Sequence, residues 1–241
     1  MSYVWDQIRA AIPLITHGNP YLMNLLWVSI RVALISTSAA LVIGLPLGLA
    51  LGLGRFRGRR TLQILANASL ALPSVVVGIA LLLLLLPGGA FGSLQIEFTL
   101  PAVYIAQAIL ALPYIVALTP AAIQGLPPGL LAQARALGAG RVQLSLLALR
   151  EAKIGLLAAV IAAAGATIAE VGAVVIIGGN FEGQDQTLAS GLMDQFNYTG
   201  HQPLVTAIAI MLLALILAMA GVLTVIQQRT GGIRLRFRTA A

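Results

Sequence analysis

Two ionisable side chains, Arg31 and Glu170, fall inside long apolar stretches of the sequence. A charge within a bilayer is costly and is kept where it pairs, binds a ligand or lines a pathway, so both residues are candidates for function. Thr167 lies one helical turn before Glu170, on the same face. We expect either an ion pair or shared hydrogen-bond network between Arg31 and Glu170, or an Arg31 that extends to the lipid headgroups.

Three prolines, Pro46, Pro73 and Pro113, also lie within apolar stretches. Each removes a backbone donor and can kink its helix, and the irregular backbone must then be shielded by protein or line a cavity. Ser74 places a hydroxyl next to one of these breaks. Kinked helices with hydroxyls suit a pathway for a polar solute, although inert bundles contain them too.

The sequence contains no arrangement of residues that is typical of a catalytic or metal-binding site. No Gly-x-x-x-x-Gly-Lys-Ser/Thr phosphate loop is present, and no glycine precedes the single lysine, Lys153. His17 and His201 are isolated, and there is no cysteine, so no metal-ligand spacing can be found. We therefore expect no catalytic residue, no metal site and no cofactor.

The elements that position these residues follow from composition. The 241 residues are 59% apolar and only 9% charged, with a mean hydropathy of +0.98, which excludes an ordinary soluble domain. A helix of about 20 apolar residues crosses a hydrocarbon core of about 30 Å. Five stretches are long enough: 25–53, 64–86, 100–123, 155–178 and 203–226. The sequence predicts an all-α integral membrane protein with five transmembrane helices in a single domain, 1–241.

The charges predict the orientation of the chain. The connections after the second and fourth stretches carry acids alone, Glu97 in the first and Glu182, Asp185 and Asp194 in the second. The other connections are basic, which marks the cytoplasmic side and places the N-terminus outside and the C-terminus inside. The formal charge of +7 thus reflects membrane topology and contact with lipid, and we expect no nucleic-acid partner. The cytoplasmic cations are Arg55, Arg57, Arg59, Arg60, Arg135, Arg141, Arg150, Lys153, Arg229, Arg234, Arg236 and Arg238.

The N-terminal residues 1–21 form a segment of their own. Apolar side chains recur at helical spacing, at Trp5, Ile8, Ile12 and Ile15. We expect an amphipathic helix over 3–16 that lies on the outer interface, with simple anchoring as its role.

Glycines recur every fourth residue in the first apolar stretch, at Gly44, Gly48 and Gly52. Small residues at this spacing let a neighbouring helix approach closely. This pattern predicts helix packing.

The segment 127–150 is polar and basic, unlike the other connections. It begins with Pro127-Pro128, continues as a run of small residues and turns at Gly138 and Gly140. A cytoplasmic segment of this kind predicts a docking surface for a partner, and a loop that merely lies on the inner leaflet is the alternative. The residues expected to dock are Ala132, Gln133, Ala134, Arg135, Leu137, Gly138 and Arg141.

This segment resembles the signature of permease subunits of ATP-binding-cassette importers of the five-span (MetI-like) type. The family pattern is Glu-Ala-Ala, three residues, then Gly, and it falls here on Ala132, Gln133, Ala134 and Gly138. The acid is absent, while Arg135, Leu137 and Gly138 keep the Arg-x-Leu-Gly form. The resemblance covers nearly the whole chain. It implies that residues 129–149 form coupling helices that dock on a cytoplasmic ATPase and transmit its closure.

Other motifs resemble tungstate permeases most, with molybdate and sulfate permeases as near relatives. The resemblance implies a homodimer in a bacterial or archaeal plasma (inner) membrane, two ATPase subunits, and a periplasmic or lipoprotein oxyanion-binding protein that delivers to the outer segments 88–99 and 180–202. Glu170, Thr167, Pro73, Ser74 and Arg31 would then belong to the pathway and gate, with Thr119 and Gln107 as further polar contacts. The motifs are Leu72-Pro73-Ser74-Val75-Val76-Val77-Gly78, Arg150-Glu151-Ala152-Lys153, Ile168-Ala169-Glu170-Val171-Gly172-Ala173 and Gly178-Gly179-Asn180.

Three other functions stay open from the sequence. A secondary transporter or channel would work without ATP, but it would normally carry more intramembrane carboxylates or an inverted repeat. A membrane scaffold would transport nothing. An amino-acid or methionine permease of the same importer class is disfavoured by the Ile-Ala-Glu-Val-Gly-Ala run at 168–173.

Overall fold

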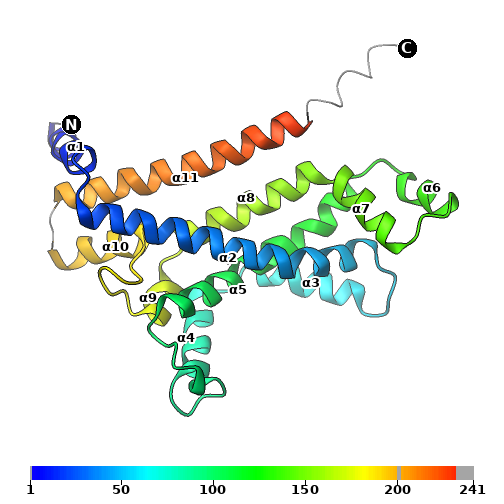
Figure 1. Ribbon diagram of the computed structural model, residues 1–241, viewed down its shortest axis with the longest axis horizontal. Coiled ribbons are helices and arrows are strands. Elements are labelled where there is room, and N and C mark those ends of the chain that lie inside the picture. The colour runs from blue at the N-terminus through cyan, green and yellow to red at the C-terminus, as the bar shows by residue number, and fades with distance from the viewer. Residues whose placement is uncertain (1, 200–201, 232–241) are drawn as a thin grey trace. The chain divides into compact units, whose positions relative to one another are not determined.

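The computed structural model describes residues 2–199 and 202–231, and these residues form helices and short connections without a strand (Figure 1). The all-α expectation is confirmed for this part of the chain. His201, Arg234, Arg236 and Arg238 lie outside the described residues. The helices are α1 (Ser2–Thr16), α2 (Pro20–Leu53), α3 (Arg59–Ser69), α4 (Ser74–Leu85), η1 (Gly92–Leu94), α5 (Leu100–Gln124), α6 (Leu130–Ala136), α7 (Arg141–Glu151), α8 (Lys153–Ala169), α9 (Gly172–Gly178), α10 (Leu188–Asp194), η2 (Gln195–Thr199) and α11 (Gln202–Gly231).

The chain divides into two compact units. The first unit comprises Met1–Ser38, Leu72–Ala111 and Ala164–Ala218, and the second comprises Ala39–Ala71, Leu112–Ala163 and Met219–Ala241. One boundary falls between α3 and α4, and the other four fall inside α2, α5, α8 and α11, so each of these four helices contributes residues to both units.

The helices that could span a membrane are of two kinds, continuous helices and bent pairs of helices. Three described helices, α2, α5 and α11, are long and apolar enough to cross a bilayer, and two bent pairs bring the number to five if each pair counts as one span. The bend between α7 and α8 is 72°. The stretches 64–86 and 155–178, which we expected to be continuous spans, are both interrupted. The first breaks before Ser74, and the second breaks between α8 and α9.

The prolines differ in their effect on the helices. Pro73 precedes the first residue of α4 and adopts an extended backbone with ψ 121°. It lies between α4 and the preceding helix α3, which ends at Ser69. Pro46 and Pro113 lie inside α2 and α5, whose helical backbones continue past them. The predicted proline break is therefore found at only one of the three positions.

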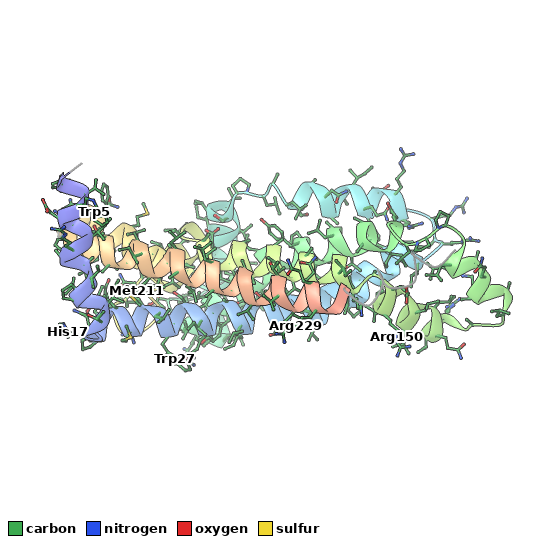
Figure 2. The ribbon with its side chains drawn as sticks, turned by 90° about the horizontal axis from the view of Figure 1, so that it is seen from above. Trp5, His17, Trp27, Arg150, Met211 and Arg229 are labelled. Carbon is green, nitrogen blue, oxygen red and sulfur yellow. The ribbon has the colours of Figure 1, made fainter. Side chains whose placement is uncertain are left out.

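The first unit has two hydrophobic clusters. One joins α2, α5 and α9 through residues such as Val32, Val103 and Ile177. The other joins α1, α2, α10 and α11, and it includes Ala11, which is fully buried. The expected N-terminal helix is present: α1 packs one face on this cluster, while Trp5 is exposed (Figure 2). Its position on the outer interface stays a prediction.

The second unit is held by close contact between α2 and α5. A methyl group on Gly48 would lie 2.6 Å from Thr119 Cβ, and one on Gly44 would lie 2.9 Å from Ile115 Cβ. One on Gly52 would reach Ile123. The predicted glycine packing is confirmed, because all three glycines face α5, and at Gly44 and Gly48 an added methyl would meet the Cβ atom of a residue of α5.

Gly48→Ala is expected to destabilise the protein by about 1–3 kcal/mol, because the added methyl overpacks the contact with Thr119. The control is Gly221→Ala in α11, where nothing lies within 4 Å of the added methyl. Alanine should stabilise that helix slightly, since it is the better helix former. Thermal unfolding of both variants in detergent measures the difference. Equal melting temperatures would show that the α2–α5 contact does not limit stability.

The segment 180–199 is held by buried side chains and hydrogen bonds, and it includes the helices α10 and η2. Asp185 is fully buried and accepts hydrogen bonds from the backbone N–H groups of Asn180 and Phe181, both at 2.9 Å. Ser29 Oγ accepts a bond from the N–H of Leu188 and so ties the segment to α2. Asp185 is one of the acids that we expected in an outer connection, and the structure buries its carboxyl, which closes the turn. Glu182 is exposed.

Burial raises the pKa of Asp185, and its backbone hydrogen bonds oppose that rise only in part. A carboxyl with a raised folded pKa contributes stability that is present below its ordinary pKa and is lost as the pH rises through the folded value. We therefore expect the melting temperature of the natural protein to fall as the pH rises through the folded pKa of Asp185. The melting temperature of Asp185→Asn should lack this fall, because the amide does not titrate. The variant should also be less stable throughout, because an amide offers one acceptor oxygen in place of two. Parallel pH slopes for the two proteins would contradict this expectation.

Candidate functional site

The two helix breaks meet in the first unit. A methyl group on Gly172, the first residue of α9, would lie 2.7 Å from Val75 Cγ2 and 3.2 Å from Ser74 Oγ. The start of α9 therefore touches the start of α4, and the two helices continue side by side (Figure 1). Gly78 repeats the contact further along, since its methyl would lie 3.0 Å from Ala173 Cα. Pro73, Ser74 and Glu170, which we predicted as pathway residues, are thus brought to one place.

Glu170 lies at the break in the fourth apolar stretch, between α8 and α9. It is half-buried, and its Oε1 accepts a hydrogen bond from the N–H of Ala173 at 3.2 Å. A carboxylate at this position satisfies an unpaired N–H and interacts favourably with the positive end of the helix that follows. The site therefore combines a carboxylate, the Ser74 hydroxyl and two helix starts.

Arg31 does not join this site. Its side chain is exposed, and in the described part of the chain no ion pair connects it to Glu170. The direct pair that we considered is absent from this conformation. The exposed position fits the alternative, in which Arg31 extends to the headgroups.

The other predicted polar residues differ in whether their polar atoms are free to bind a solute. Thr167 and Thr119 are buried, and each hydroxyl donates to a carbonyl on its own helix, Ala164 at 2.8 Å and Ile115 at 2.6 Å. Gln107 is fully buried, and neither its Oε1 nor its Nε2 has a partner in the described chain. Gln107 therefore keeps unused hydrogen-bonding capacity, whereas the two hydroxyl protons are used locally.

The second candidate region is the segment α6–α7 in the second unit. Ala132, Gln133, Arg135 and Arg141 are exposed, and Ala134 is half-buried. Gly138 follows α6 with a φ of 86°, in the left-handed region where glycine carries no steric cost. The two short helices are therefore set by a glycine turn. Buried Ala148 and Ala152, at the end of α7, hold the segment against α5.

The most exposed apolar side chains of this segment form its docking candidate. Leu137 is 88% exposed, Val142 72% and Leu146 60%. Such side chains on a connection that we expect on the cytoplasmic side indicate a surface that a partner covers. Val142 and Leu146 were missed in the sequence, although their i, i+4 spacing on a basic segment was a usable signal. Nothing in the described chain covers them.

Comparison with known proteins gives consistent findings. A family model described as "Binding-protein-dependent transport system inner membrane component" matches residues 44–232. The tungstate uptake system permease protein TupB of Peptoclostridium acidaminophilum is 30% identical over 228 residues, which cover 95% of this chain and 100% of that protein. A probable anion ABC transporter permease protein of Haloferax volcanii is 37% identical over 167 residues, 69% of this chain and 72% of that protein.

The fold also has a solved counterpart. An inward-facing structure of the MetNI methionine ABC transporter contains a chain that superposes with a TM-score of 0.72, at 20% identity, over 88% of this chain and 99% of that one. This likeness concerns the fold alone.

Proposed function

This chain belongs to the family of binding-protein-dependent transport system inner membrane components, and we propose that it forms the translocation pathway of an ATP-driven oxyanion importer, with tungstate as the substrate. It is a permease subunit of the ATP-binding-cassette importers and an inner-membrane protein. The observation that carries the proposed substrate is the match to a tungstate permease over 95% of this chain. Relatives named for molybdenum and sulfate transport make these anions the nearest alternatives.

Energy for transport comes from separate ATPase subunits in this proposal. The sequence has no phosphate loop, and the exposed apolar surface at Leu137, Val142 and Leu146 offers a docking area on the expected cytoplasmic side. We expect two copies of the permease and two ATPases. A homodimer would enclose the pathway, with the N-terminus outside and the C-terminus in the cytoplasm.

Alternating access would act on the two helix breaks. Because α4 and α9 begin at interruptions that contact each other, a shift of one helix start moves the other without breaking a continuous helix. Glu170 holds one arrangement through its bond to Ala173. Ser74 and the unpaired Gln107 are the groups proposed to make transient contacts with the anion.

Delivery is proposed from a soluble oxyanion-binding protein on the outer side. The exposed Glu182 disfavours entry of free anion near its segment. A binding protein overcomes this repulsion because it carries the anion to the mouth of the permease. The segments 88–99 and 180–199 are the proposed docking surfaces.

The test is copurification followed by transport. Gentle solubilisation of native membranes should recover this chain with an ATPase at equal copy number, and the complex in proteoliposomes should hydrolyse ATP faster with binding protein plus tungstate. Molybdate and sulfate supplied in the same assay decide the substrate. Recovery of the chain alone, with anion flux in vesicles lacking ATP, would replace the importer by a secondary transporter or channel.

A further inference from the structure

A groove of about 740 Å³ lies in the second unit, and its lining comes from the end of α2 and from the segment α6–α7. Its lining combines two chemistries. Three arginines contribute to it: Arg55, Arg135 and Arg141. The remaining wall is mainly apolar and includes Pro46, Leu49, Leu53, Phe56 and Leu144.

The three guanidinium groups lack anionic partners. All three side chains are exposed, and none forms an ion pair or side-chain hydrogen bond in the described part of the chain. Arg59 differs, since its Nη2 donates to the carbonyl of Gly52 at 3.1 Å and closes the end of α2. The sequence of the second unit contains a single acidic residue, Glu151. The unit therefore cannot neutralise this cluster itself, and an anion from outside would.

We propose that this groove binds an anionic phospholipid of the cytoplasmic leaflet. Its phosphate would lie against Arg55, Arg135 and Arg141, and an acyl chain would follow the apolar wall. A free oxyanion gains nothing from hydrocarbon, whereas an amphiphile uses both parts of the lining. The groove also lies where a predicted membrane span ends at Leu53, the depth at which headgroups meet a basic segment.

A lipid bound in this groove would connect segments that are far apart in the sequence. Arg135 is in the last turn of α6, and Arg141 is the first residue of α7, whereas Arg55 follows α2. A phosphate bound by all three arginines would hold the segment α6–α7 to the end of α2. This site does not depend on the proposed substrate, because lipid binding is measured on the purified permease without ATP or oxyanion.

The experiment compares neighbouring arginines. Arg55→Gln removes a lining guanidinium, and Arg57→Gln removes an exposed one that does not line the groove. The full chain, purified in detergent and supplied with phosphatidylglycerol or phosphatidylcholine, is analysed by native mass spectrometry. The natural protein and Arg57→Gln should retain phosphatidylglycerol in preference to phosphatidylcholine. Arg55→Gln should retain about fivefold less phosphatidylglycerol, the effect of one guanidinium near an anionic surface.

A second variant tests the apolar wall. Ala50 is exposed and lines the groove, so Ala50→Trp should fill it and reduce phosphatidylglycerol retention with all arginines present. Equal retention by the Arg55 and Arg57 variants would overturn the proposal, since it would show general surface attraction. Unchanged retention in Ala50→Trp would overturn it as well. Full displacement of the lipid by inorganic phosphate or tungstate would identify a free-anion site instead.

Discussion

Leu137→Asp is expected to abolish ATP-driven uptake and the recovery of ATPase with the permease. The side chain is 88% exposed, so the fold of the permease gains little from it. A partner that covers this leucine gains about 2 kcal/mol from burial of the side chain, or about thirtyfold in affinity, and a buried carboxylate adds a further penalty. The measurements are ATPase copurification at equal permease yield and uptake in proteoliposomes.

Two matched variants separate docking from folding. Leu137→Met keeps an apolar side chain and should copurify the ATPase as the natural protein does. Leu94→Asp makes the same chemical change at a leucine that is 56% exposed in the connection between α4 and α5. It should leave ATPase recovery unchanged, because this connection is on the predicted outer side. Normal ATPase recovery with Leu137→Asp would remove this residue from the docking surface.

Glu170→Gln is expected to lower oxyanion uptake about tenfold without changing the amount of protein in the membrane. The amide oxygen can still accept the hydrogen bond from Ala173, so the start of α9 should remain formed. A hydrogen bond to a charged acceptor contributes about 1.5–3 kcal/mol and one to a neutral acceptor about 0.5–1.5 kcal/mol. A difference of about 1.4 kcal/mol shifts the balance between two arrangements of the break tenfold.

The comparison for this variant is Asp6→Asn, the same change from carboxylate to amide at an exposed residue of α1. A single exposed charge contributes little, so uptake should stay within about twofold. Glu170→Ala also removes the acceptor and should reduce thermal stability by about 1 kcal/mol, which separates the capping role from the role of the charge. Uptake by Glu170→Gln at the natural rate, with normal expression, would exclude a gating role for this carboxylate.

Hydropathy predicted where the long helices lie, but it overestimated their continuity. The stretch 155–178 contains no proline, yet it breaks between Ala169 and Gly172. Gly172 must contact Val75 of α4 without a side chain between them, and this contact exists only when two distant parts of the chain are packed together. A local pattern contains no information about that distance.

Polar side chains show the same limit. Thr167 and Thr119 were reasonable candidates for solute contacts, but in the folded chain their hydroxyls donate within their own helices. Asp185 was expected among the acids of an outer connection, and its side chain is fully buried. Residue type shows that a group can donate or accept, whereas its partner depends on which backbone groups the fold leaves unpaired.

The sequence by itself determined the membrane class, the glycine face of α2, the N-terminal helix and the segment that resembles coupling helices, because composition, spacing and short motifs are local properties. Only the tertiary structure decided that Pro73, Ser74 and Glu170 lie at one contact between two interrupted helices, and that three arginines from separate segments share an apolar groove. Those arrangements join residues far apart in the chain, and they exist only because close packing of helices brings their side chains together.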